Sequence, residues 1–225
     1  MENWKDIWNR RKPKDLNDLQ DLINANGFDT SHLLAKNLTD YINSVRKKMG
    51  MSPGESVFEV GCGCGSILYL LHNANLYVGG LDYSESLIEI AKKLDLSEDI
   101  SVGLANEICI EPKYDYVISN SITQYFLNLN YVETVACLMM EKSLKGSIAI
   151  LDINDLAKED LYLDIRRKAE PNYDEKYKNF QHLFVDKQFW VDLASKYSWE
   201  VIIEDQDIPE YKNSQFRYNV FITNQ

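Results

Sequence analysis

Three glycines at alternate positions and one aspartate carry the clearest chemical signal in this sequence. The stretch VFEVGCGCG (57–65) ends an apolar run with Gly61, Gly63 and Gly65, and Asp82 closes the next apolar run within GLDYS. Glycines allow a tight turn and let a ligand approach the bare main chain. An acid about 20 residues further on is placed to accept hydrogen bonds from ribose hydroxyls. The pair therefore predicts a site for a nucleoside-containing cofactor.

The spacing of the glycines also bears on which cofactor binds. The dinucleotide fingerprint is G-x-G-x-x-G. Here Ser66 occupies the third glycine position of that pattern, and the glycines run as G-x-G-x-G instead. This argues against a nicotinamide-dependent oxidoreductase, which stays open as an alternative.

Alternating apolar and helical stretches must position these residues. Short apolar runs separated by segments of helical periodicity are typical of a doubly wound, mostly parallel α/β sheet. The predicted strands are 56–61, 76–82, 100–105, 114–121, 147–153, 200–206 and 216–223. The predicted helices are 15–25, 31–49, 64–73, 84–94, 130–143 and 186–197. The last two apolar runs have no helical pattern between them, so we expect a hairpin that ends the sheet with an antiparallel strand.

Five motifs in this order resemble class I S-adenosylmethionine-dependent methyltransferases. The sequence contains EVGCGCG, GLDYS, YDYVISNSITQYF, SLKGSIAILDIND and FQHLFVDKQFWVDLASKYSWEVIIED, which together cover roughly 55–223. The resemblance implies a Rossmann-like sheet of seven strands with an antiparallel last strand. It also implies S-adenosyl-L-methionine as the cofactor and methyl transfer as the reaction.

The resemblance assigns the cofactor contacts to residues of these motifs, with Asp82 on the ribose. Leu104 stands where the family often has an acid for the adenine amino group, so Asn106 or Glu107 is expected to substitute. The residues expected to bind the cofactor are Glu59, Gly61, Cys62, Gly63, Gly65, Asp82, Tyr83, Ser84, Asn106, Glu107, Asn120 and Ser121.

Candidate catalytic residues come from segments that face the acceptor in this family. His182 lies in QHLF and is interpreted either as a base or acceptor ligand or as a structural residue. Tyr125 follows the fourth strand and is expected to line the methyl-transfer site. Asp152 ends the fifth strand and is a second candidate base, with a role in the turn as its alternative. Such a base is needed where the nucleophile must lose a proton.

The resemblance also suggests a division of the chain. We expect an N-terminal helical cap over 1–50 and a methyltransferase domain over 51–225, with a substrate-side insert at about 155–185. Trp4 and Trp8 lie on one face of a short helix because they are four residues apart. They are interpreted either as a stripe that faces the core or as a lid over the site.

The composition of the chain indicates which kinds of binding partner are disfavoured. The formal net charge is −11, from 24 basic and 35 acidic residues, which disfavours nucleic acid as a partner. The first twelve residues have no apolar signal region, and no run is long enough to cross a membrane. We therefore expect a cytoplasmic protein. The four cysteines lack the paired spacing of a zinc site, so no metal is expected.

The acceptor is expected to be small and polar, because the insert is charged and aromatic. A sugar, a sugar nucleotide or a phosphorylated metabolite is favoured, with O-methylation as the reaction. W-x-x-x-W at the start, NSITQYF and RYNVF are loosely similar to bacterial methyltransferases of surface-polysaccharide modification. A protein with the same fold that binds S-adenosylmethionine without catalysis, or acts as a partner subunit, stays open as an alternative. The oligomeric state does not follow from the sequence.

Overall fold

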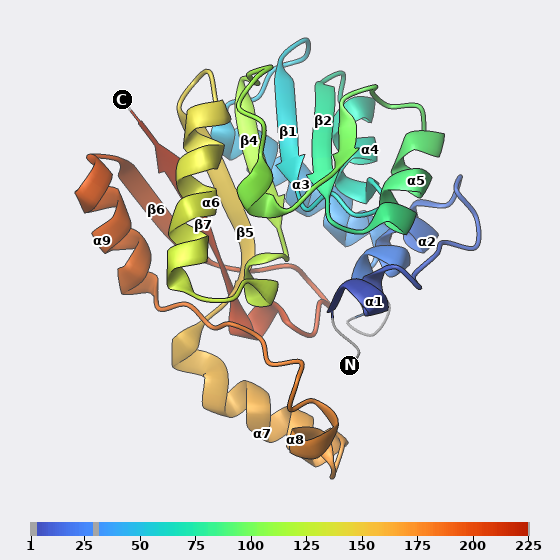
Figure 1. Ribbon diagram of the computed structural model, residues 1–225, viewed down its shortest axis with the longest axis vertical. Helices are drawn as coiled ribbons and strands as arrows, with labels where there is room; N and C mark the ends of the chain where they lie inside the picture. The colour runs from blue at the N-terminus through green and yellow to red at the C-terminus, as the bar shows by residue number, and fades with distance from the viewer. Residues whose placement is uncertain (1–3, 29–31, 225) are drawn as a thin grey trace.

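Seven strands form one central sheet in the computed structural model, which describes residues 4–28 and 32–224 (Figure 1). The strand order is β3-β2-β1-β4-β5-β7-β6. The strands are β1 (Ser56–Val60), β2 (Tyr77–Asp82), β3 (Ile100–Val102), β4 (Tyr116–Asn120), β5 (Ser147–Asn154), β6 (Glu200–Asp205) and β7 (Arg217–Thr223). β7 pairs antiparallel with both β5 and β6, and the other neighbours are parallel. The predicted doubly wound sheet with an antiparallel last strand is confirmed.

Helices cover both faces of the sheet because its inner strands are buried on both sides. Val57 and Phe58 are adjacent in β1, yet they belong to two different hydrophobic clusters, since successive side chains point to opposite faces. The first cluster contains α3 (Ala35–Met49), α4 (Ser66–Asn73) and α5 (Glu85–Lys93), and the second contains α6 (Leu129–Lys142) and α9 (Lys187–Tyr197). Among the described residues, no helix combines the length and the apolar character needed to cross a membrane.

The N-terminal segment differs from the prediction of two long helices. The expected helix 15–25 is reduced to α2 (Leu19–Ile23), and a π-helical segment (Asn24–Phe28) follows it. Gly27 in this segment has φ 90°, and a Cβ atom there would lie 2.5 Å from the Trp8 ring. The described part of the second expected helix begins at Ala35. A short helix, α1 (Trp4–Trp8), precedes these elements.

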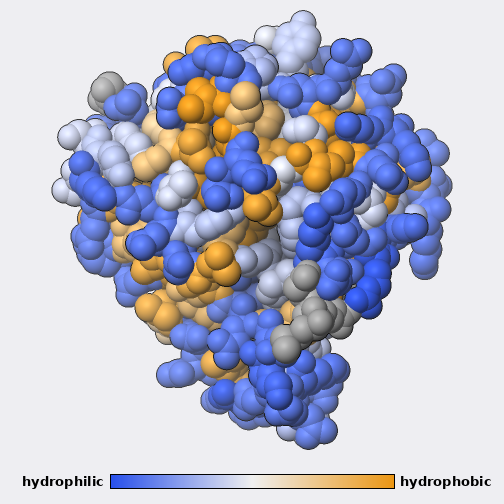
Figure 2. Space-filling view, in the orientation of Figure 1, coloured by the Kyte–Doolittle hydropathy of each residue, from blue (hydrophilic) through white to orange (hydrophobic). Residues whose placement is uncertain are grey.

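The region predicted as a charged insert contains helices that the sequence pattern does not reveal. These are α7 (Glu159–Ala169) and α8 (Tyr173–Lys176), which project below the sheet in Figure 1. Tyr162 is the buried residue of α7, so this helix has no broad apolar stripe to recognise. In Figure 2 the surface of this projection is mostly hydrophilic.

Candidate functional site

A cavity of about 280 Å³ lies at the carboxyl ends of β1, β2 and β4. Strand order reverses here, because β1 lies between β2 and β4, and doubly wound sheets bind their ligands at this point. The cavity brings together seven of the residues predicted to bind the cofactor. These are Glu59, Gly61, Gly63, Asp82, Tyr83, Asn120 and Ser121.

The glycine turn and the acid of β2 are joined by a direct hydrogen bond. The backbone N–H of Gly63 donates to Oδ2 of Asp82 (3.0 Å), and that of Ser84 donates to Oδ1 (2.8 Å). Gly61 has φ 78°, and a Cβ atom there would lie 2.4 Å from Cγ2 of Ile122. The turn therefore requires glycine at this position, both for its backbone conformation and for the space beside it.

Asn26 also lines the cavity, and sequence reasoning missed it. Its Nδ2 donates to Oγ of Ser66 (2.7 Å), and its Oδ1 accepts from the N–H of Cys64 (2.8 Å). A Cβ atom on Gly63 would lie 2.3 Å from this same Oδ1. One side chain thus attaches the N-terminal segment to the glycine turn. In the sequence, NANG indicates only a turn.

Three polar groups of the cavity wall are buried and have no hydrogen-bond partner in the described structure. They are Nε1 of Trp8, Oε2 of Glu59, whose residue is 2% exposed, and the hydroxyl of Tyr83. Burial, and then the charge of Asp82, raise the pKa of Glu59. Burial also raises the pKa of Asp82, although backbone hydrogen bonds from Ser84 and Gly63 oppose that shift. Unpartnered buried polar atoms are rare in native proteins, so these fit a site whose ligand supplies the missing partners.

Comparison with known proteins identifies the family. Residues 51–206 match the family described as a methyltransferase domain. The chain belongs to this family. A local match, 34% identical over 79 residues, relates the chain to malonyl-[acyl-carrier protein] O-methyltransferase of Priestia megaterium. That match spans 33% of this chain and 29% of the relative's length.

Solved structures share the fold of this methyltransferase. Magnesium protoporphyrin IX methyltransferase from Synechocystis PCC 6803 has a TM-score of 0.62 at 14% identity, covering 98% of this chain and 90% of that one. DesVI from Streptomyces venezuelae has a TM-score of 0.61 at 14% identity, covering 95% of this chain and 100% of that one. At these identities the likeness concerns the fold alone.

Five of the residues predicted to bind the cofactor are not in the lining of the methyltransferase's cavity. Cys62 is buried within the turn, Gly65 caps α4, and Ser84 caps α5. Asn106 is exposed and accepts a hydrogen bond from the Tyr131 hydroxyl (2.9 Å).

Glu107 is the fifth of these residues, and its side chain accepts a hydrogen bond from the backbone N–H of Leu104 (3.0 Å). The reason is that β3 ends at Val102, three residues earlier than predicted. Leu104 and Ala105 therefore line the cavity in place of Asn106 and Glu107.

The helix α1 covers the cavity with two indole rings, because Trp4 and Trp8 both belong to its lining. Trp8 also packs against a hydrophobic cluster that contains Leu22 and Leu87, so the helix contacts both the core and the cavity. Polar contacts attach this helix to α5. Lys5 Nζ lies 2.7 Å from Oε1 of Glu85, and the hydroxyl of Ser84 donates to Oδ1 of Asn9 (2.7 Å).

His182 and Tyr125, both predicted as catalytic, lie side by side under Trp4. Their ring centroids are 5.4 Å apart, and the Trp4 ring stacks on His182 at 5.1 Å. Nδ1 of His182 is 3.2 Å from the Tyr162 hydroxyl, whereas Nε2 is buried without a partner. Burial, aided by the charges of Arg217 and Arg166, lowers the pKa of His182 to about 3. The imidazole is therefore neutral at physiological pH.

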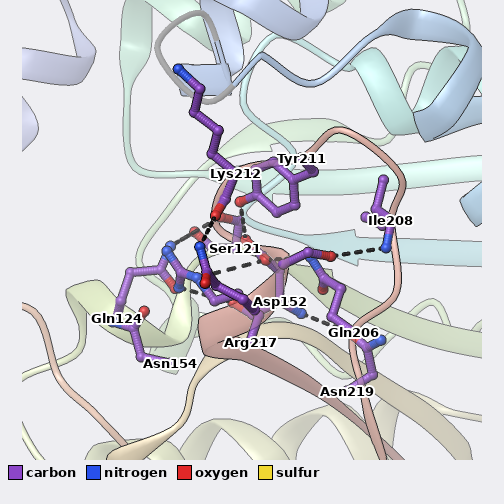
Figure 3. A network of polar contacts seen from close by, with 12 residues as sticks. Ser121, Gln124, Asp152, Asn154, Gln206, Ile208, Tyr211, Lys212, Arg217 and Asn219 are labelled. Carbon is purple, nitrogen blue, oxygen red and sulfur yellow. Dashed lines mark hydrogen bonds and ion pairs between the residues drawn. The ribbon is translucent and has the colours of Figure 1, made fainter. Parts of the chain in front are cut away.

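Asp152, the third predicted catalytic residue, is not in the cavity lining and lies in a buried network (Figure 3). Its carboxylate accepts hydrogen bonds from Nε2 of Gln206 (2.8 Å) and the Tyr211 hydroxyl (3.1 Å). Nε of Arg217 lies 3.8 Å from the same carboxylate. The strand register shifts between Ile150 and Ile153, where Asp152 has φ 58°, and this irregularity directs the residue into the network. The role of Asp152 as a base stays a prediction, although these groups contact the carboxylate that a base would need free.

Proposed function

We propose that this methyltransferase O-methylates a small polar acceptor. The observation that carries the proposal is the cavity in which the glycine turn, Asp82, and the unpartnered groups of Glu59 and Tyr83 come together. The cofactor is S-adenosylmethionine, which supplies a methyl group activated by a sulfonium charge. Asp82 is expected to accept hydrogen bonds from the ribose hydroxyls, since its carboxylate lines the cavity. Glu59 offers a buried oxygen to the positively charged part of the cofactor.

The residues around His182 are proposed to act on the acceptor. The neutral imidazole of His182 carries its proton on either Nδ1 or Nε2. When the proton is on Nδ1, Nε2 has a free lone pair and can take the proton of an acceptor hydroxyl. Tyr125 forms the wall between this ring and the cavity. Trp4 and Trp8 exclude water above both. Asp152 is assigned a positioning role, since it holds Arg217 in place.

The acceptor is proposed to be a sugar, a sugar nucleotide or a phosphorylated metabolite. The charged and aromatic insert at 155–185 and the loose similarity to enzymes of surface-polysaccharide modification support this class. The net charge of −11 disfavours nucleic acid as the acceptor. We expect the protein in the cytoplasm, with residues 1–50 acting as a cap on the methyltransferase domain.

Calorimetric titration tests the cofactor. We expect S-adenosylhomocysteine to bind the purified protein with micromolar affinity and NAD not to bind. Binding of NAD alone would favour the oxidoreductase alternative. Binding of S-adenosylhomocysteine without turnover of any acceptor would favour the non-catalytic alternative.

A substitution at His182 tests the proposed base. His182→Ala is expected to lower kcat by about 10²–10⁴-fold and to leave the affinity for S-adenosylhomocysteine unchanged. Because the pKa of His182 is about 3, its titration should not lower the rate between pH 8 and pH 5. His72→Ala, at an exposed position of α4, is the control and should leave both quantities unchanged. Equal losses of rate and cofactor affinity in His182→Ala would indicate a structural role instead.

A further inference from the structure

Buried polar atoms without hydrogen-bond partners are concentrated beside the cavity. Nine side-chain atoms of this kind occur in the described part of the chain. Three belong to residues of the cavity lining, namely Trp8, Glu59 and Tyr83. Five others belong to residues outside that lining, which lie near the ends of β4, β5 and β6, at the start of β7 and in the segment before α9. This acceptor cluster consists of Gln124, Asn154, His182, Gln206 and Arg217.

Hydrogen bonds show that the members of the acceptor cluster are neighbours. The N–H of Leu183 donates to the carbonyl of Gln124 (2.9 Å), and the carbonyl of Leu183 accepts from Nδ2 of Asn154 (3.1 Å). Gln124 and Asn154 therefore flank the residue that follows His182. Arg217 is paired with Asn154 in the β5–β7 register. Figure 3 shows Gln124, Asn154, Arg217 and Gln206 around Asp152.

The unpartnered atoms of the three amides are their carbonyl oxygens. The hydrogen bond that each amide nitrogen donates fixes the orientation of the group. Nε2 of Gln124 donates to the carbonyl of Ser121 (2.7 Å), and Nδ2 of Asn154 donates to that of Leu183. Nε2 of Gln206 donates to the carboxylate of Asp152 (2.8 Å). These partners only accept hydrogen bonds, so the donating atoms must be the amide nitrogens. The unpartnered atoms are therefore three oxygens that can only accept.

This donor and acceptor pattern selects among ligand chemistries. Three carbonyl oxygens repel a carboxylate or a phosphate, and the charge of Arg217 is already countered by Asp152. An ammonium group could donate to the oxygens, but it has no lone pair to accept a hydrogen bond from Nε of Arg217. A hydroxyl can donate to the amide oxygens and also accept from the free Nε–H of Arg217.

We propose that the reacting end of the acceptor is a neutral, hydroxyl-rich group, a sugar or polyol, bound by the acceptor cluster. Any phosphate or carboxylate that the acceptor carries lies outside this subsite. The inference rests on the proposed function, because it places the methylated hydroxyl beside Nε2 of His182. Trp4 stacks on the face of that ring and also contacts Phe180 at 5.1 Å, and Nε2 is buried, so the acceptor reaches Nε2 only when the side chains around it move.

A ligand-observed NMR experiment on the protein saturated with S-adenosylhomocysteine tests this subsite. Saturation transfer would be compared between neutral hexoses, pentoses and inositol, the matching uronic acids, and hexose phosphates. We expect the neutral compounds to bind about tenfold more tightly than the uronic acids of the same ring. The carboxylate of a uronic acid cannot donate to the amide oxygens, and about tenfold corresponds to the loss of one hydrogen bond. Tighter binding of the uronic acids, or no binding of any neutral compound, would overturn the inference.

Calorimetry on the same sample separates this inference from the proposed function. Failure of S-adenosylhomocysteine to bind contradicts the proposed function. Binding of S-adenosylhomocysteine without binding of a neutral compound contradicts only the assignment of the subsite.

Two substitutions each remove one amide of the acceptor cluster, its free oxygen together with its donating nitrogen. Gln124→Met and Gln206→Met keep the length of the side chain, and each is expected to weaken binding of the neutral compounds about fivefold to tenfold. The affinity for S-adenosylhomocysteine should stay the same. If the two glutamines only supported the fold, their replacement would weaken the binding of S-adenosylhomocysteine as well. Arg46→Met is the matched control, because Nε of Arg46 is also buried and unpartnered but lies on α3, outside the acceptor cluster. Loss of neutral-compound binding in this control, or its retention in both glutamine variants, would overturn the inference.

Discussion

The cofactor cavity and the acceptor cluster lie next to each other but are constructed differently. The core of the cavity comes from one continuous stretch, 59–83, and backbone N–H groups hold its acid in place. The acceptor cluster takes single side chains from positions between 124 and 217, and a buried ion pair lies at its centre. Main-chain groups are available to any sequence that forms the turn, whereas a buried charge needs a particular partner. The same type of residue should therefore have different roles in the two regions.

Replacing Asp152, the acid paired with Arg217 of the acceptor cluster, is expected to have the largest effect, and this effect is on stability. Asp152→Ala should lower the free energy of unfolding by about 3–5 kcal/mol, because Arg217 would stay buried without its carboxylate. Urea denaturation measures this loss. Asp174→Ala breaks the exposed pair between Asp174 and Arg167 and should cost less than about 1 kcal/mol. Equal losses in the two variants would remove the contrast on which this comparison depends.

Replacing the acid of the cofactor cavity is expected to affect binding instead. Asp82→Ala should weaken the binding of S-adenosylhomocysteine by about 1–3 kcal/mol, because hydrogen bonds to a charged group are lost. The free energy of unfolding should change less than in Asp152→Ala, since no buried cation depends on Asp82. Calorimetry and urea denaturation measure the two quantities.

The control for this position is Asp99→Ala. Asp99 accepts a hydrogen bond from the Tyr114 hydroxyl (2.6 Å) and is not part of the cavity lining. Its replacement should leave the affinity for S-adenosylhomocysteine unchanged. An unchanged affinity in Asp82→Ala would contradict the placement of the ribose.

The difference between the cofactor cavity and the acceptor cluster also explains which features could be predicted from the sequence. The sheet and the glycine turn were predictable because apolar runs, glycines and Asp82 follow one another locally along the chain. Asn106 and Glu107 lie outside the cavity lining because the end of β3 depends on pairing with β2, which a continuous apolar pattern does not reveal. The burial of Asp152 follows from a strand irregularity and from contacts with Gln206, more than 50 residues away.

Helices with little apolar surface also could not be predicted from the spacing of apolar residues. In α7, Tyr162 is the one buried residue, and its partners lie in distant segments, Phe184 and Phe216. Long-range packing of this kind leaves no local repeat in the sequence. The role of Asn26 was missed for the same reason, because its hydrogen-bond partners Cys64 and Ser66 lie about 40 residues away in the sequence.

Asn26 offers the smallest and most specific test of the comparison. It is a side chain that contributes to a region otherwise held by the main chain, and its hydrogen bonds reach the carbonyl of Cys62, the N–H of Cys64 and the hydroxyl of Ser66. Asn26→Ala should weaken the binding of S-adenosylhomocysteine by about 1 kcal/mol, the usual net value of a hydrogen bond. Asn37→Ala, which removes the exposed hydrogen bond to the carbonyl of Pro209, is the control. If both variants bind S-adenosylhomocysteine like the wild type, the glycine turn holds its shape without the N-terminal segment, and the cofactor region depends on its main chain alone.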